Sequence, residues 1–230
     1  MTLLRIDGVT VRFGGIVALD GVSFEVRRGE VCALIGPNAA GKSTLFHCLS
    51  RLYECDSGEI EFDGQPLHRL PRHRMVGLGI GRTFQNLALF RSMTVRENVL
   101  MGCHSRHHAG FLRTAFRLPG VARIEAAAAA QADALIDFLG LGADAQRVVA
   151  DLPFGTQKRV EMARALAAQP QLLLLDEPAC GLNHEEMHGL GTLIRDVCDR
   201  LGVTVLLVEH HMGLVMGISD RVVALYFGRK

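Results

Sequence analysis

The sequence predicts an α/β domain with a mostly parallel sheet covered by helices on both sides, an N-terminal antiparallel β subdomain and an inserted helical subdomain. The first 26 residues contain short β-rich runs broken by glycine, as in an antiparallel sheet with tight turns. The last third alternates helix-favouring stretches with continuous apolar runs, which is typical of parallel strands buried on both faces.

The elements follow from composition along the chain. A buried strand is expected at 31–35, directly before a glycine-rich loop and a helix at 43–52, with a further strand at 59–62. From about 87 to 157 the chain is alanine-rich and has no continuous apolar strand. The stretch 125–139, with five consecutive alanines, is expected to be a helix because alanine has the highest helix propensity.

The last third completes the pattern. Helices are expected at 156–168 and 185–200 and from residue 212, and strands at 171–176, 203–209 and 221–227. The chain then forms a single domain, with a core at 1–87 and 158–230 and a helical insertion at 88–157.

Composition excludes several classes of protein. Hydrophobic residues make up 49% of the 230 residues, which is enough for a packed core and excludes a disordered chain. The net charge of +1 gives no global field that would attract nucleic acid, so none is expected as a partner. Neither a membrane span nor a secretory signal is visible, and the six cysteines have no metal-finger spacing, which indicates reduced thiols in a cytosolic protein.

The strongest motif lies between the strand at 31–35 and the following helix. Residues 36–44 satisfy the pattern G-x-x-x-x-G-K-[ST], in which backbone N–H groups and a helix N-terminus bind phosphate. Lys42 would neutralise β- and γ-phosphate oxygens, and the Ser43 hydroxyl would bind Mg²⁺. The alternative is an ordinary glycine turn. The predicted nucleotide-binding residues are Gly36, Pro37, Asn38, Ala39, Ala40, Gly41, Lys42, Ser43 and Thr44.

An acidic pair follows four consecutive leucines. Asp176 ends the strand at 171–176, where ligands bind in open α/β sheets, and is predicted to hold the magnesium ion. Glu177 would then lie beside the γ-phosphate and polarise the attacking water. The alternative for an acidic pair after a strand is a helix N-terminal cap. The phosphate loop favours the catalytic interpretation.

Further motifs occur in an order that resembles the ATP-binding subunit of an ABC transporter. The stretch 152–161, Leu-Pro-Phe-Gly-Thr-Gln-Lys-Arg-Val-Glu, is similar to the family's signature motif, and 82–85, Arg-Thr-Phe-Gln, is similar to its Q-loop. Gly-Leu-Asn at 181–183 resembles the D-loop, and Val-Glu-His at 208–210 resembles the segment with the switch histidine. The resemblance covers essentially the whole chain.

The resemblance implies roles for individual residues. Phe13 would stack on adenine, Gln85 would sense Mg²⁺ and the γ-phosphate, and His210 would hold the attacking water together with Glu177. Two copies would pack head to tail, so that each completes the other's ATP site, with Asn183 at the seam between them. The signature residues that would reach the partner's ATP are Pro153, Phe154, Gly155 and Thr156.

Within the family, the stretches 12–15, 82–86, 89–98 and 214–220 resemble importers of branched-chain amino acids and related hydrophobic or amide solutes. That resemblance implies a second ATPase subunit, identical or homologous, two membrane permeases and an external solute-binding protein. The chain would then lie on the cytoplasmic face of the inner membrane. The alternatives are the ATPase of a lipid or polysaccharide exporter, a soluble ABC protein and an inactive nucleotide-binding regulator.

Three positions depart from the family pattern. Ala39 stands where most relatives have glycine, at a cost of roughly 1 kcal/mol if that residue needs a positive φ. Pro153 replaces the usual signature serine and removes a hydroxyl donor. His211 follows the switch histidine where aspartate is usual, and we assign the switch to His210.

Two metal-like patterns are set aside. His184 and His188 match H-E-x-x-H, but they follow the strand that is predicted to hold magnesium and have no third ligand in the sequence pattern. Cys103 precedes three histidines, at positions 104, 107 and 108, in a polar connection. Neither group is predicted to bind a metal.

Overall fold

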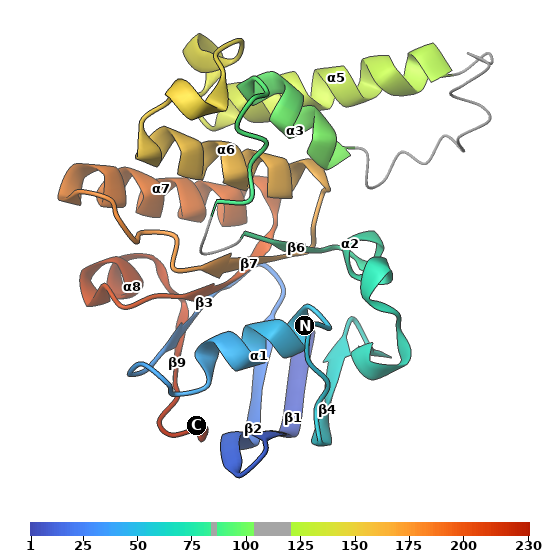
Figure 1. Ribbon diagram of the computed structural model, residues 1–230, viewed down its shortest axis with the longest axis vertical. Coiled ribbons are helices and arrows are strands. Elements are labelled where there is room, and N and C mark those ends of the chain that lie inside the picture. The colour runs from blue at the N-terminus through green and yellow to red at the C-terminus, as the bar shows by residue number, and fades with distance from the viewer. Residues whose placement is uncertain (84–86, 104–120) are drawn as a thin grey trace. The chain divides into compact units, whose positions relative to one another are not determined.

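The computed structural model describes residues 1–83, 87–103 and 121–230. The chain divides into two compact units (Figure 1): Met1–Gln85 with Gln171–Lys230 forms the first, and Asn86–Pro170 forms the second. Both sheets lie in the first unit, and the second unit is helical. This confirms the predicted α/β class with an antiparallel β part and an inserted helical part.

The antiparallel sheet has the strand order β2-β1-β4-β5. Its strands are β1 (Thr2–Phe13), β2 (Ile16–Arg27), β4 (Ser57–Phe62) and β5 (Gln65–Pro66). The predicted break at Gly8 is instead an irregularity within β1, where the pairing with β2 shifts register. Gly8 has a φ of 59° and donates its N–H to Ser23 Oγ at 2.8 Å, so its backbone stays hydrogen-bonded through the irregularity.

The second sheet is parallel, with the strand order β6-β7-β8-β3-β9. Its strands are β3 (Val31–Ile35), β6 (Ile80–Arg82), β7 (Leu172–Asp176), β8 (Thr204–Val208) and β9 (Arg221–Ala224). The sequence did not predict β6, because the strand is short and includes glycine. The carboxyl ends of the neighbouring strands β3, β8 and β7 meet at one edge, which is where ligands bind in such sheets.

Helices cover both faces of the parallel sheet. In the first unit these are α1 (Lys42–Leu49), α2 (Met75–Leu78), α7 (His184–Leu201) and α8 (Met212–Ile218). Figure 1 shows α1 on one side of the sheet and α7 and α8 on the other. Side chains alternate accordingly: Leu172 and Leu174 belong to the core cluster that includes α1, whereas the intervening Leu173 is buried outside that cluster.

The described residues of the second unit include α3 (Val95–Cys103), α5 (Val121–Phe138), α6 (Phe154–Ala167) and two short 3₁₀ turns, Gly142–Asp144 and Val149–Asp151. The helices α3 and α6 pack closely at Gly102, where any side chain would collide with the backbone carbonyl of Arg164. The sequence placed the end of the insertion at residue 157. That boundary falls within α6, and the whole helix belongs to the second unit because it packs on α3 and α5.

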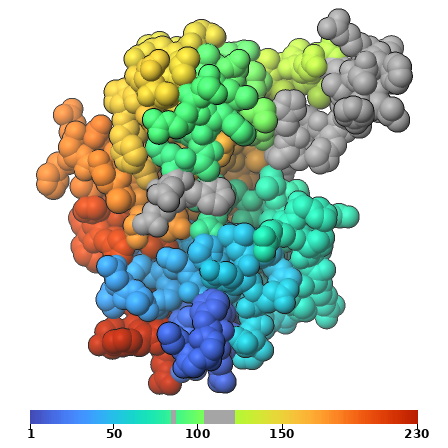
Figure 2. All heavy atoms as spheres, in the orientation of Figure 1, coloured from blue at the N-terminus to red at the C-terminus, as the bar shows by residue number. Residues whose placement is uncertain are grey.

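The C-terminal residues contact the phosphate-loop region of the first unit. Leu225 N–H bonds to the carbonyl of Ile35 at 2.8 Å, and Gly228 N–H bonds to that of Ala40 at 3.1 Å. Asp20 N–H donates to the Gly228 carbonyl at 2.8 Å, so the end of the chain lies beside β2, as Figure 2 shows in red and blue. Among the described residues, every helix is too short or too polar to span a lipid bilayer.

Candidate active site

The loop at 36–41 has the backbone conformation that its glycines allow. Gly36 and Gly41 have φ values of 150° and 97°, which L-residues rarely adopt. A side chain on Gly36 would collide with the carbonyl oxygen of Leu225, and a Cβ on Gly41 would lie 2.5 Å from that of Ala18. Both positions therefore require glycine, and the loop is clamped between the C-terminal segment and β2.

Ala39 has a φ of 64°, so this residue adopts the positive φ at which glycine is favoured over alanine. The left-handed conformation costs an alanine roughly 1 kcal/mol relative to glycine. The loop keeps its fold despite this cost because Ala40 next to it is buried and hydrogen-bonded: its N–H donates to the Pro37 carbonyl at 3.2 Å.

Lys42 is buried at the start of α1, and its ammonium group folds back over the loop. Nζ donates to the carbonyl oxygens of Gly36 and Pro37 at 2.7 and 2.8 Å. Burial lowers the pKa of Lys42, and the negative charges of Glu177 and Asp176 oppose that shift. The two carboxylates predicted to act with the loop are therefore close enough to affect its lysine.

A pocket of about 410 Å³ opens over the loop. Phe13, at the end of β1, is 45% exposed and lines it together with Ile16 and Val17, so one wall is apolar. Ala18, residues 38–44 and Glu177 line the rest. The pocket thus combines an apolar, partly aromatic wall with a cationic loop and one carboxylate, which suits a nucleotide with its base on the wall and its phosphates on the loop.

Asp176 ends β7 and pairs with Arg82 at the end of β6. Arg82 Nη2 lies 3.0 Å from Asp176 Oδ2, and each side chain is 9% exposed. Arg82 also donates from Nη1 to Ser50 Oγ at 2.9 Å, just beyond α1. The guanidinium thus joins β6, β7 and the end of α1, and sequence reasoning had noted Arg82 only as part of the Q-loop-like motif.

Glu177 and His210 are in direct contact. Their side chains meet at 2.8 Å, between Glu177 Oε1 and His210 Nε2. Glu177 has a φ of 47°, a conformation that costs a non-glycine residue about 1–3 kcal/mol and that is found most often at functional sites. Its N–H donates to the Val208 carbonyl at 3.0 Å, which fixes the turn. The structure thus brings together the two residues assigned to catalysis, although 32 residues separate them in the chain.

Sequence reasoning missed Glu209. Its carboxylate is buried, with Oε1 accepting from Ala179 N–H at 2.8 Å and Oε2 from His210 N–H at 2.8 Å and His211 N–H at 3.2 Å. These hydrogen bonds connect the segment after Glu177 to the segment that carries His210. A glutamate next to a predicted functional histidine, directly after five buried strand residues, is the signal that could have identified it.

The signature-like residues begin α6 in the second unit. Pro153 is the N-cap residue, with a φ of −55° and no side-chain cap, and Thr156 is buried in the first turn. Phe154 is 45% exposed, and Lys158 Nζ lies 5.5 Å from the centre of its ring. The motif thus presents the N-terminus of a 14-residue helix, whose first N–H groups have no partner within the helix.

Asn183 and Gln85 complete the predicted set. Asn183 caps α7: its Oδ1 accepts from Glu186 N–H at 2.9 Å, and its own N–H donates to Glu186 Oε2 at 3.0 Å. This reciprocal capping box fixes the loop before α7. Gln85 lies outside the described residues.

The two patterns set aside in the sequence are placed as follows. His184 and His188 lie in the first turns of α7. Cys103 is buried at the end of α3, while the histidines that follow it lie outside the described residues. Within the described part of the chain, no group of three or more His, Cys, Asp or Glu residues is arranged to hold a metal ion.

Comparisons with known proteins show the family of the chain. The family model described as ABC transporter matches residues 19–180. The high-affinity branched-chain amino acid transport ATP-binding protein BraF of Pseudomonas aeruginosa is 41% identical over 226 residues, which cover 98% of this chain and 89% of that protein. LivG of Escherichia coli, with the same description, is 41% identical over 220 residues, covering 96% and 86%.

A solved structure, a nucleotide-free ATP-binding cassette from an ABC transporter, superposes with a TM-score of 0.85 at 30% identity, covering all of this chain and 89% of that one. The residues 19–180 that the family model matches include the phosphate loop, Asp176 and Glu177. The chain therefore belongs to the ABC transporter family and is one of its ATP-binding subunits.

Proposed function

We propose that this chain is the ATP-hydrolysing subunit of an importer of branched-chain amino acids or related solutes. The contact between Glu177 and His210 at 2.8 Å, with Glu177 lining the pocket over the phosphate loop, is the observation that carries the hydrolytic role. The names of relatives aligned along nearly the whole chain support the solute class and import rather than export.

Each residue at the pocket has a separate role in binding or hydrolysing ATP. Phe13 stacks on the base, Lys42 and the backbone N–H groups of the loop at 36–41, in which Pro37 has none to offer, bind the phosphates, and Glu177 takes the proton of the water that attacks the γ-phosphate. His210, with Nε2 against Glu177 Oε1, orients that carboxylate. Lys42 must release the carbonyls of Gly36 and Pro37 to reach the phosphates, so ATP replaces the two hydrogen bonds that its ammonium makes in this structure.

The donors present fit magnesium. Ser43 offers a hydroxyl at the pocket, and Asp176 offers a carboxylate of which only Oδ2 is paired with Arg82 in the described contacts. Magnesium prefers such oxygen ligands and would supply charge neutralisation on the β- and γ-phosphates. Gln85 is proposed as a third group near the ion.

Two subunits are proposed to close over ATP. The N-terminus of α6 carries partial positive charge that favours the γ-phosphate of a partner subunit, with Pro153, Phe154, Gly155 and Thr156 at the contact. Asn183, held by its capping box, would lie at the seam. Two membrane permeases and an external binding protein would complete the importer at the cytoplasmic face of the inner membrane, with no nucleic acid involved.

The solute class is tested by reconstitution with the cognate permease pair and binding protein in liposomes. Binding protein loaded with leucine, isoleucine or valine should stimulate ATP hydrolysis, whereas the same protein offered glutamate should not. Stimulation that requires a lipid or polysaccharide substrate on the ATPase side, and no binding protein, would support the exporter alternative and contradict the proposal.

The substitution Glu209→Gln should lower kcat by about tenfold or more and leave the Kd for ATP unchanged. Glutamine has one acceptor oxygen where glutamate has two, so either the N–H of Ala179 or those of His210 and His211 lose their acceptor, and a buried donor without a partner costs about 1–3 kcal/mol. Glu209 acts through His210 and does not line the pocket. Phosphate release should therefore be slower than in the wild type, while ATP titration should give the wild-type Kd.

Glu30→Gln is the matched control for Glu209→Gln, because Glu30 is also buried and accepts a backbone N–H, that of Arg27, at 2.8 Å. It should lower thermal stability without a comparable loss of kcat. Equal losses in both variants would assign Glu209 a structural role alone.

The substitution Pro153→Ser should strengthen the ATP-dependent dimer about tenfold. Serine restores a hydroxyl donor at the N-cap of α6, and a hydrogen bond to a charged group contributes about 1.5–3 kcal/mol. The dimer Kd is measured by sedimentation in a Glu177→Gln background, with Ala143→Ser, an exposed position in the same unit, as control. An unchanged Kd would place Pro153 away from the partner's phosphate.

A further inference from the structure

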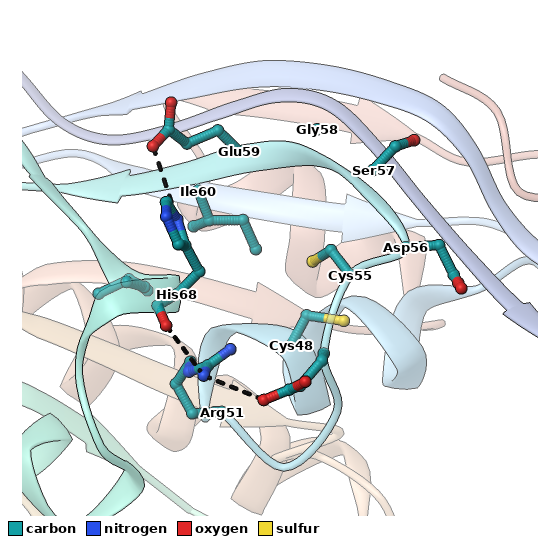
Figure 3. A pocket seen from close by; sticks show the side chains of 11 residues that line it. Cys48, Arg51, Cys55, Asp56, Ser57, Gly58, Glu59, Ile60 and His68 are labelled. Atoms are coloured by element: carbon teal, nitrogen blue, oxygen red, sulfur yellow. Dashed lines mark hydrogen bonds and ion pairs between the residues drawn. The ribbon is translucent and has the colours of Figure 1, made fainter.

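A second pocket of the first unit, of about 490 Å³, lies apart from the phosphate-loop pocket, and the two have no lining residue in common. It is formed by the last turn of α1, the segment that leads to β4, the first half of β4, and Leu67 and His68 (Figure 3). Its lining includes two cysteines, Cys48 and Cys55, which none of the roles proposed above uses.

The two thiols line the same pocket and differ in access. Cys48 is buried on α1, whereas Cys55 is partly exposed in the following loop, and Figure 3 shows both side chains at the pocket near Arg51 and Asp56. The neighbouring Cys48 thiol lowers the pKa of Cys55, and Arg51 adds to that effect against the opposing effect of burial. The pKa of Cys48 is raised by the Cys55 thiol and by burial. Cys55 is therefore both the more accessible thiol of the pair and the one whose pKa is lowered.

The other cysteines lack this combination. Cys32, Cys103 and Cys198 are buried, and burial raises the pKa of each, to about 12 for Cys32. Cys180 is exposed in the loop after Glu177. Reaction with an oxidant requires both access and thiolate character, so Cys55 is the favoured site among the six.

We propose that Cys48 and Cys55 form an oxidation-sensitive dithiol that a hydroperoxide converts to a disulfide. The Cys55 thiolate attacks the terminal peroxide oxygen, the O–O bond breaks, and Cys55 becomes a sulfenic acid as water or an alcohol leaves. The Cys48 sulfur then attacks the Cys55 sulfur, the S–O bond breaks, and water leaves with the Cys48 proton. The two thiols supply the two electrons that reduce the peroxide, and a thiol reductant reverses the reaction.

The position of the dithiol connects it to the nucleotide pocket, and this part rests on the proposed function. The segment that carries Cys55 also carries Tyr53, whose ring packs edge-on against Phe13 with 5.2 Å between centroids. Asp56 Oδ2 accepts the N–H of Arg12 at 2.7 Å, next to Phe13. A disulfide that draws Cys55 toward α1 displaces this support, and the loss of one aromatic pair corresponds to about a two- to tenfold weaker binding of ATP.

The covalent step is tested on the full chain without nucleotide. Protein treated with dilute hydrogen peroxide is alkylated, digested and analysed by mass spectrometry. The expected product is a peptide pair joined through Cys48 and Cys55, formed before Cys180 is oxidised and lost after dithiothreitol. In Cys48→Ser, and in Cys48→Ala should the serine variant fold poorly, Cys55 should stop as a sulfenic acid that dimedone traps. If Cys48 and Cys55 can both still be alkylated once Cys180 has been oxidised, no disulfide has formed between them and the proposal is wrong.

The coupling is tested by ATP titration of the reduced and the cross-linked protein. The cross-linked wild type should bind ATP about two- to tenfold more weakly, and peroxide-treated Cys55→Ser should bind like its reduced form. Equal affinity of reduced and cross-linked wild type would overturn the coupling. Failure of the reduced protein to bind ATP would instead contradict the proposed function, and the mass spectra still decide the dithiol.

Discussion

The substitution Glu177→Gln is expected to reduce ATP turnover by about 10²–10⁴-fold while ATP still binds, because a positioned general base contributes a factor of that size. Glutamine retains the shape of the side chain and its contact with His210 but cannot take the proton of the attacking water. With hydrolysis stopped, the two subunits should stay closed over ATP. Phosphate release measures the loss of turnover, and size-exclusion chromatography with Mg·ATP should show a dimer.

Glu185→Gln is the matched control for Glu177→Gln, since Glu185 is an exposed carboxylate in the first turn of α7. It should hydrolyse ATP at the wild-type rate. A Glu177→Gln protein that remains monomeric at saturating ATP would count against the two-subunit clamp, and one that hydrolyses ATP normally would remove Glu177 from the chemistry.

The substitution Lys42→Ala should weaken ATP binding by about 100-fold or more. Lys42 supplies the buried ammonium of the loop, and two charge-assisted hydrogen bonds to phosphate contribute about 1.5–3 kcal/mol each. Fluorescence titration with a labelled nucleotide measures the Kd.

A control is needed for Lys42→Ala because the lysine also bonds to the carbonyls of Gly36 and Pro37, so its loss could loosen the loop itself. Thermal unfolding of the variant reports any such loss, and Lys230→Ala, at an exposed position, should bind ATP normally. Wild-type affinity in Lys42→Ala would refute the assignment of the phosphate loop.

Much of the fold could be predicted because its strongest signals are local. The strand Val31–Ile35 was placed at its observed bounds, since five successive apolar residues end at a glycine-rich loop. The edge strand β6 was missed because three residues with a central glycine carry no periodic pattern, and only pairing with β7 makes them a strand. The predicted boundary at 157 falls within α6, whose packing on α3 and α5 joins segments far apart in the chain.

The site shows the same division. The spacing from Gly36 to Ser43 and the acidic pair after four leucines predict the phosphate loop and the roles of Asp176 and Glu177 from residue types alone. The pairing of Arg82 with Asp176 at 3.0 Å and the buried carboxylate of Glu209 could not be identified in this way. Arg82 lies 94 residues from Asp176, and Ala179 lies 30 residues from Glu209; each pair meets because parallel strands end at one edge of the sheet.

The sequence by itself predicted the chemistry of this protein, because glycines, a lysine and carboxylates at this spacing, with a strand before the loop and a helix after it, are typical of a phosphate site. Only the tertiary structure decided how those groups are held. It holds the loop between Ala18 and Leu225, places Glu177 in a left-handed turn with its side chain against His210, and places Cys48 and Cys55 on the lining of one pocket. The physical reason is that such contacts arise from the order of strands in the sheet and the packing of α1, and neither leaves a periodic signal in the chain.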